Sequence, residues 1–224
     1  MRYAGLRERY GFWGLLLSLS LAFTTGPFLT SAVHPVSVFL VCALLLSVIV
    51  VGNNKLKLIF GASLVFPVVI SVLLMPTASS AGMLIFFYGA NASFFVYVIF
   101  FLFRYLFSAP NVTTNTLLAS LSIYFALAIV WGMLYGLLEV FYPGSFKLGL
   151  EQGSNPKIND LLYFSVVTLT TLGYGDISPL SPQAKTVAAT EALVGQIYLT
   201  VLVARLVGLH IAESSTEREA AKRS

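Results

Sequence analysis

The segment from Thr170 to Asp176 reads Thr-Thr-Leu-Gly-Tyr-Gly-Asp, and its glycine spacing suits cation binding by backbone oxygens. A cation that loses its water needs several oxygens around it. Consecutive carbonyl groups of one chain can point the same way only if the backbone alternates in handedness. Glycine adopts the left-handed conformation at no steric cost, and Gly173 and Gly175 lie two residues apart. The pattern therefore predicts a row of carbonyl groups that faces a dehydrated cation.

The apolar segment that must position these residues, Leu161 to Leu172, is too short to cross a membrane. As a helix it would reach about 18 Å, whereas the hydrocarbon core of a bilayer is about 30 Å thick. We therefore predict a re-entrant helix. Non-helical backbone at membrane depth is tolerated only where protein buries it or where it lines a water-filled path. The residues that follow Leu172 are therefore predicted to line such a path.

The composition of the chain indicates a membrane protein. Of its 224 residues, 58% are hydrophobic and 10% are charged, whereas a soluble domain carries about 25% charged residues. About 20 apolar residues span a bilayer as a helix. The predicted fold class is an all-α membrane protein with six transmembrane helices and one re-entrant pore helix with its loop. The six predicted spans are Phe12–Thr30, Val36–Val51, Leu56–Met75, Gly82–Phe107, Thr116–Tyr142 and Gln183–Ile211.

The charges between these spans predict how the chain is oriented. Lysine and arginine are enriched in cytoplasmic loops, and ten of the thirteen basic residues fall on one side if both termini are cytoplasmic. The expected location is a cell membrane, either plasma or bacterial inner. The pI near 9.2 does not indicate a nucleic-acid partner, because the basic residues lie between apolar segments and form no patch.

A cleaved signal peptide is an alternative interpretation of the N-terminus. Basic residues precede the first apolar run, and Ser20-Leu21-Ala22 could serve as a cleavage site. The run nevertheless continues to about Leu29, which is long enough to span, so an uncleaved first helix is favoured.

In this setting Thr171-Leu172-Gly173-Tyr174-Gly175, followed by Asp, resembles the signature of the potassium channel family. The resemblance implies a homotetramer around one K+-selective pore. The carbonyl groups of Thr171, Leu172, Gly173 and Tyr174 would bind K+, the Thr171 hydroxyl would form the innermost site, and Gly175 would complete the filter. At position 172 this chain has leucine, whereas valine is commoner in the signature of the family. Leu172 contributes a carbonyl rather than its side chain, so selectivity is expected to survive.

The resemblance also implies residues that support the filter. Thr170 and Asp176 flank it, and Tyr163-Phe164 stand where the family often has two tryptophans. Tyr163 either hydrogen-bonds Asp176 behind the filter or only packs as an aromatic side chain. Val167 stands where some members have a buried glutamate, so one filter-closing hydrogen bond is expected to be missing.

The last apolar stretch offers three gating candidates. Gly195 has the spacing of the inner-helix hinge in simple two-span potassium channels, although a glycine in a span is also a packing device. Thr200 would face the inner pore. Glu191 is either functional, as expected for an intramembrane carboxylate, or a protonated side chain satisfied by hydroxyls of the re-entrant helix, such as those of Thr168 or Thr170. Farther along the same stretch, Arg205 either lines the inner mouth or snorkels near the helix end.

The predicted domains are a transmembrane bundle at residues 1–110, a pore domain at 111–212 and a short cytoplasmic tail at 213–224. Six-span channels that resemble this chain usually carry a voltage sensor in the bundle. Such a sensor needs arginines at every third residue of its fourth helix and acidic partners in the helices before it.

The bundle of this chain lacks those charges. Its fourth span offers only Arg104, at the inner end, and no Asp or Glu occurs between Glu8 and Glu139. We therefore expect no steep voltage gating. The bundle is expected to be held by packing, with Asn91 and Ser93 as polar groups that bond between helices. The tail is too short for a nucleotide- or calcium-binding domain.

The predicted function is a passive K+ channel subunit that works among membrane lipids, without enzymatic activity and without a cofactor besides the permeant ion. One alternative is a poorly selective cation channel, although filters that tend that way lose the second glycine or the tyrosine. The other is an intramembrane serine protease. Gly61-Ala62-Ser63 and His210 would supply its nucleophile and base, which must lie within hydrogen-bond reach.

Overall fold

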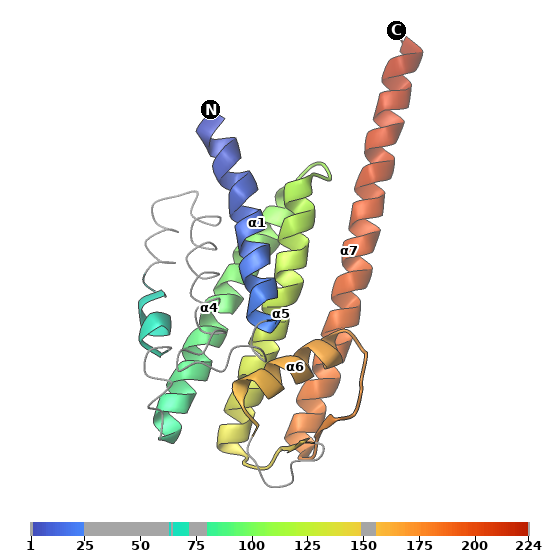
Figure 1. Ribbon diagram of the computed structural model, residues 1–224. Helices are drawn as coiled ribbons and strands as arrows, with labels where there is room; N and C mark the ends of the chain where they lie inside the picture. Colours follow the sequence, from blue (N-terminus) through green and yellow to red (C-terminus); the bar gives the residue numbers. More distant parts are fainter. Residues whose placement is uncertain (1, 25–62, 64, 72–79, 149–155, 224) are drawn as a thin grey trace.

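The computed structural model describes residues 2–24, 63, 65–71, 80–148 and 156–223 of the chain. A short helical stretch covers residues 65–71, and the elements on either side of it are arranged as Figure 1 shows. In chain order they are α1 (Arg2–Thr24), α4 (Ala81–Ser108), α5 (Thr114–Phe141), β1 (Phe146–Leu148), α6 (Ile158–Leu169), β2 (Ile177–Pro179) and α7 (Pro182–Arg223).

Three of these helices are long and apolar enough to cross a membrane: Ala81–Ser108, Thr114–Phe141 and the first part of α7, Pro182–Leu209. They agree with the fourth, fifth and sixth predicted spans to within two residues at each end, except that α7 continues farther. The helix α1, which contains most of the first predicted span, begins at Arg2 instead of Phe12. The second and third predicted spans lie largely outside the described residues, so the total of six stays a prediction.

Local sequence explains where α4 and α5 begin and end. Ser80 caps α4 by accepting a hydrogen bond from the Met83 backbone N–H, and Thr113 and Thr116 form a reciprocal capping box at the start of α5. Between the helices, Ala109 is extended because it precedes Pro110, which disfavours the helical conformation in the residue before it.

The core of the described bundle lies between α1, α4 and α5. Large apolar side chains from all three helices are buried there, among them Phe12 and Leu15 of α1, Phe94 and Phe95 of α4, and Met133 of α5. At Gly136 the ring of Tyr88 occupies the place where a Cβ would lie. The glycine therefore lets α4 and α5 approach closely, as small residues do between membrane helices.

The expected interhelical polar contact is present at Asn91. This side chain is fully buried, and its Nδ2 donates to Ser71 Oγ (3.2 Å) and to the carbonyl of Phe87 (2.8 Å). Ser93, the other expected residue, is exposed. Asn91 therefore forms a polar bridge within a bundle whose buried side chains are mostly apolar.

The helix α6 ends three residues earlier than the sequence suggested. The predicted run continued to Leu172, whereas the helix stops at Leu169. Thr170 still has right-handed helical angles, but Thr171 has a φ of +58°. A left-handed residue ends a right-handed helix, so the apolar Leu172 belongs to the loop.

The helix α7 runs unbroken from Pro182 to Arg223, so no structural boundary separates the predicted tail at 213–224 from the span. Only 11% of its membrane-length window is buried within the chain, against 61% for α5. Leu193, Ile197 and Val203 are each more than half exposed. One chain therefore leaves most of this helix without protein contacts.

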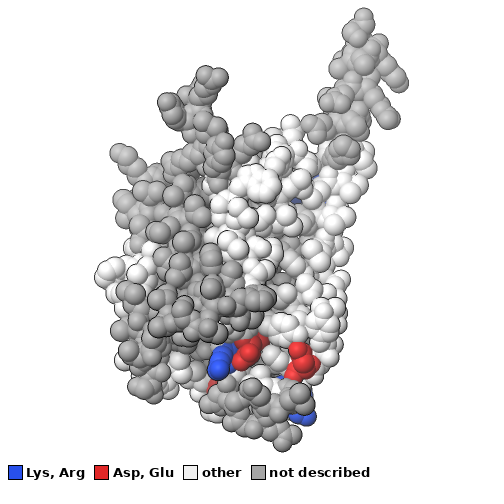
Figure 2. Space-filling view, viewed as in Figure 1, with Lys and Arg blue, Asp and Glu red and all other residues white. Residues whose placement is uncertain are grey.

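Figure 1 shows the start of α1 and the end of α7 at the same end of the molecule. This arrangement is what two termini on one side of a membrane require, and the side itself stays a prediction. Of the charged side chains that Figure 2 colours, most gather at the opposite end, below a described surface that is almost free of charge. The distribution suits a chain whose apolar middle is covered by lipid.

Candidate ion-conduction site

The backbone of the loop after α6 alternates in handedness, as its glycine spacing predicted. The φ angles are +58° at Thr171, +61° at Gly173 and +80° at Gly175, while Leu172 and Tyr174 between them are not left-handed. This is the geometry that consecutive carbonyl groups need if they are to face one side.

Thr171 adds a third left-handed residue that the glycine pattern could not reveal. In the described residues it is the one non-glycine with a positive φ, and a β-branched residue in that region is strained by about 1–3 kcal/mol. Such strain persists only where the surroundings impose it and is concentrated at functional sites. The inner end of the loop is therefore held in place by its neighbours.

The last turn of α6 provides the inner attachment of the loop. The Thr168 carbonyl accepts from the Thr171 N–H at 2.9 Å, and the Val167 carbonyl accepts from the N–H groups of Leu172 (2.9 Å) and Gly173 (3.4 Å). The Val167 side chain is apolar and buried, so this position supports the loop with its backbone instead of the absent carboxylate.

The outer attachment lies at Asp176. Tyr163 Oη donates to Asp176 Oδ2 at 2.7 Å, while Oδ1 accepts from the backbone N–H of Ile177 at 2.9 Å. The contact between Tyr163 and Asp176 that the sequence suggested is thus present. Because this hydrogen bond favours the phenol, it raises the pKa of Tyr163, which lies in the short helix α6, to about 12. Tyr163 therefore stays a donor over the physiological pH range.

A two-stranded antiparallel sheet continues this outer attachment. Strand β2 begins directly after Asp176 and pairs with β1, with Leu148 opposite Ile177 and Phe146 opposite Pro179. Each strand has only three residues, too few for a period-two pattern to stand out in the sequence. The segment before α6 therefore holds the exit of the loop through backbone pairing.

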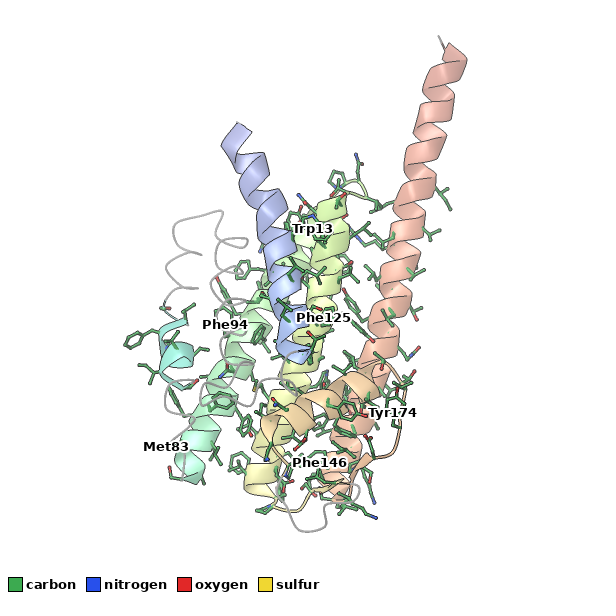
Figure 3. The ribbon with its side chains drawn as sticks, viewed as in Figure 1. Trp13, Met83, Phe94, Phe125, Phe146 and Tyr174 are labelled. Carbon is green, nitrogen blue, oxygen red and sulfur yellow. The ribbon has the colours of Figure 1, made fainter. Side chains whose placement is uncertain are left out.

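The large side chains of the loop itself are uncovered in a single chain. Leu172 is 56% exposed and Tyr174 is 67% exposed, and Figure 3 labels Tyr174 on the loop beside α7. The Tyr174 ring is therefore largely unpacked within one chain. Its partner must come from outside the chain if the ring is to be packed.

At Gly195, α7 packs closely against the end of α6. A Cβ there would lie 2.5 Å from the Leu169 carbonyl oxygen, and Tyr124 Oη of α5 donates to the same oxygen at 3.1 Å. The helix is continuous through this position. The packing interpretation of Gly195 therefore has a geometric basis, and the hinge interpretation stays a prediction.

Glu191 is fully buried, but its partners differ from those that the sequence suggested. Its carboxyl group contacts the hydroxyls of Tyr135 in α5 and Ser165 in α6, and not those of Thr168 or Thr170. The Thr170 hydroxyl instead bonds to the Val166 carbonyl at 2.7 Å. The expectation had chosen the correct helix for one partner, but one turn too near its C-terminal end, since Ser165 lies three residues before Thr168 on the same side of α6. It missed the second partner, Tyr135, which comes from α5.

Thr200, the third gating candidate, is exposed on α7, and its hydroxyl bonds to the Gln196 carbonyl of its own helix at 2.8 Å. Gln196 itself was missed. Its Nε2 lies 3.4 Å from Thr171 Oγ1, at the inner end of the loop. The signal available in the sequence was an amide side chain within the apolar part of α7.

Arg205 makes a contact that the sequence did not suggest, while its two expected places stay predictions. Its Nη2 donates to the carbonyl oxygens of Leu106 (2.6 Å) and Ala109 (3.1 Å), and its guanidinium lies 4.8 Å from the centre of the Phe107 ring. It therefore caps the C-terminal end of α4 from α7. The two helices lie about a hundred residues apart in the chain, and nothing local in the sequence indicates this contact.

No three His, Cys, Asp or Glu side chains come together as a metal site in the part of the chain that the structure describes. Backbone carbonyls and the Thr171 hydroxyl are the oxygens that the loop offers to a cation. The pair proposed for a protease cannot be compared, because Gly61, Ala62 and the side chain of His210 lie outside the described residues.

Comparison with known proteins places this region among channels. Residues 120–210 match the family described as "Ion channel". The chain is 38% identical over 65 residues to two pore potassium channel c of Oryza sativa subsp. japonica, covering 29% of this chain and 14% of that protein. It is 45% identical over 49 residues to the voltage-gated potassium channel Kch of Escherichia coli, covering 20% of this chain and 12% of that protein.

A third relative is Protein LctB of Bacillus caldotenax, 33% identical over 87 residues, which cover 38% of this chain and 64% of that protein. The matches therefore span less than two thirds of each of these relatives. No solved structure matches the chain.

The hydrogen bond between Tyr163 and Asp176 at the outer end of the loop predicts the effect of Tyr163→Phe on cation binding. The substitution removes a hydrogen bond to a charged group, worth about 1.5 kcal/mol at a partly exposed site, and should weaken cation binding by roughly tenfold. The measurement is the K+ concentration that gives half-maximal thermal protection of the purified protein. Tyr142→Phe, at an exposed tyrosine outside the loop, is the control. Equal K+ requirements in both variants would contradict a supporting role for Tyr163.

Proposed function

We propose that this chain, whose residues 120–210 match the family described as "Ion channel" and are similar to potassium channels, is the subunit of a channel that conducts K+ passively across a cell membrane. The observation that carries the proposal is the alternating backbone of Thr171–Gly175, placed directly after a helix too short to cross a bilayer. A channel accounts for both features, because irregular backbone at membrane depth needs a water-filled path beside it.

Conduction through this loop would rest on backbone oxygens. The carbonyl groups of Thr171, Leu172, Gly173 and Tyr174 replace the hydration shell of K+, with the Thr171 hydroxyl at the innermost site. A binding site made of backbone tolerates Leu172 in place of valine. Both glycines and the tyrosine are present, which favours a K+-selective pore over a poorly selective one.

Four copies of the chain would surround the pore. A single loop supplies only one column of oxygens, whereas a dehydrated ion needs a ring of them. Two surfaces support assembly: the loop side chains Leu172 and Tyr174, and the apolar side chains along α7, which are exposed in one chain. Neighbouring copies would cover them, with lipid around the outside of the assembly and both termini in the cytoplasm.

The channel would open without a steep voltage sensor. In the described part of the bundle, Arg104 is the one basic residue of α4, and its side chain is exposed near the end of the helix. No Asp or Glu occurs between Glu8 and Glu139 to pair with it on the way across. The bundle then serves as a scaffold beside the pore.

The left-handed loop residues predict the outcome of Gly173→Ala. A Cβ there meets no atom within 4 Å in the chain, but the φ of +61° is strained for any side chain. We expect K+ current in liposomes or planar bilayers to be abolished. Gly144→Ala is a matched control, since Gly144 also has a positive φ and open space but lies outside the loop. Equal Na+ and K+ permeability of the unmodified channel, measured by bi-ionic reversal potentials, would overturn the selectivity.

The exposed apolar surface of α7 predicts the assembly state. Native mass spectrometry of the detergent-solubilised protein should show a dominant tetramer. Leu193→Ala, on α7, should lower the tetramer fraction, whereas Phe100→Ala, at a similarly exposed site on α4, should leave it unchanged. A dominant monomer or dimer that still conducts K+ would contradict the proposed arrangement of four chains around one pore.

The sparse charge of the bundle predicts a shallow conductance–voltage curve. One elementary charge moved through 100 mV is worth about 2.3 kcal/mol, and steep sensors move about three to four charges per subunit. With Arg104 as the single arginine of α4, we expect an effective gating charge of roughly one or two per channel. The curve is recorded in symmetrical K+. A fitted charge of about a dozen would show that the bundle senses voltage after all.

A further inference from the structure

Behind the loop, three helices meet at one buried polar cluster. Glu191 of α7, Tyr135 of α5 and Ser165 of α6 all have no exposed surface. Tyr135 Oη contacts Glu191 Oε2, and Ser165 Oγ contacts Glu191 Oε1. Ser165 Oγ also lies 2.8 Å from the carbonyl oxygen of Ala128 in α5. We call these three side chains the Glu191 cluster.

The number of hydrogens in the cluster decides which group donates. The cluster has three contacts, but the two hydroxyls carry only two hydrogens. If Glu191 were ionised, both hydroxyls would donate to it, and Ser165 Oγ would face the Ala128 carbonyl with no hydrogen between two oxygens. If Glu191 carries a proton on Oε1, it donates to Ser165, Ser165 donates to Ala128, and Tyr135 donates to Oε2. Only the second arrangement satisfies every contact.

The surroundings of the cluster favour the neutral form for a separate reason. The Tyr135 ring packs against Phe146 and Phe164, with ring centres 5.3 and 5.0 Å apart, and Phe146 is labelled below α6 in Figure 3. In the described part of the chain no basic side chain is paired with Glu191. Tyr124, also of α5, is the other titratable group that faces it. An unpaired buried charge is costly, whereas a neutral acid with satisfied hydrogen bonds is not.

The position of Ser165 links this cluster to the loop. Tyr163, which holds the outer end of the loop, lies two residues before Ser165 in α6. Val167 and Thr168, whose carbonyls hold the inner end, lie two and three residues after it. A contact that fixes Ser165 against α5 and α7 therefore fixes the segment from which both ends of the loop are held.

We propose that Glu191 is a protonated carboxylic acid that acts as a positioning residue, fastening α6 to α5 and α7 so that the loop keeps its conducting shape. The positioning role rests on the proposed function, and the protonation does not. A carboxyl group is absent at position 167 of α6, and Glu191 of α7 thus supplies one through a different set of contacts.

Glutamine is the variant that separates this proposal from its alternatives. In Glu191→Gln the amide nitrogen can donate to Ser165 and the amide oxygen can accept from Tyr135, which reproduces the neutral acid. Glu191→Leu keeps a similar volume without either hydrogen bond. Ser165→Ala removes one partner from α6, and Ser122→Ala is its control, because Ser122 is equally buried but bonds only to the Leu118 carbonyl of its own helix.

Infrared spectroscopy of the purified full-length protein reads the proton directly. The wild type should show a carbonyl stretching band of a protonated carboxylic acid that Glu191→Gln lacks, and the band should shift in Ser165→Ala but not in Ser122→Ala. Identical spectra of wild type and Glu191→Gln in the carboxylic acid region would overturn the protonation. This measurement requires no conduction, so it stands even if the protein fails to pass K+.

Single-channel recording reads the positioning role. Open probability should be close to the wild-type value in Glu191→Gln and Ser122→Ala, and lower by roughly tenfold in Ser165→Ala and Glu191→Leu. If Glu191→Gln is as impaired as Glu191→Leu, or if Ser165→Ala conducts like the wild type, the positioning role is wrong. A wild-type protein that passes no K+ would instead refute the proposed function.

Discussion

A backbone that alternates between left- and right-handed residues cannot hold itself in place, and the rest of this structure is arranged around that constraint. Helices and sheets are stable because their own N–H and C=O groups pair. The loop from Thr171 to Gly175 has left-handed residues at every second position, and its carbonyls must stay available if they are to meet a cation. Its shape therefore has to be imposed by groups outside it, and even a strained threonine is held there.

Those groups come from elements far apart in the sequence. The last turn of α6 holds the inner end through the Val167 and Thr168 carbonyls, Tyr163 and the β1–β2 pairing hold the outer end, and α7 packs on the helix end through Gly195. Each contact uses a different kind of interaction, and all of them except the β1–β2 pairing involve the twelve-residue helix α6. The helix is therefore the part of the chain on which the shape of the loop depends most directly.

The sequence allowed good predictions wherever a strong local rule applied. Long apolar stretches located α4, α5 and α7, and the glycine spacing located the loop. Predictions were wrong where several weak effects compete. An apolar Leu172 looked like part of the helix, although the left-handed Thr171 excludes it. Thr168 and Thr170 were expected as hydroxyl partners of Glu191, whereas the structure provides Ser165, one turn earlier in α6, and Tyr135 of α5.

The sequence by itself determined that this chain belongs in a membrane, where its apolar helices lie, and which five residues can offer a row of carbonyls, since composition, length and glycine spacing act locally. Only the tertiary structure decided what holds that row in place. The pairing of Tyr163 with Asp176, the cluster around Glu191 and the capping of α4 by Arg205 join residues that are 13 to about a hundred positions apart. Which side chains meet over such separations depends on how helices pack against one another, and packing is decided by the whole set of buried surfaces at once.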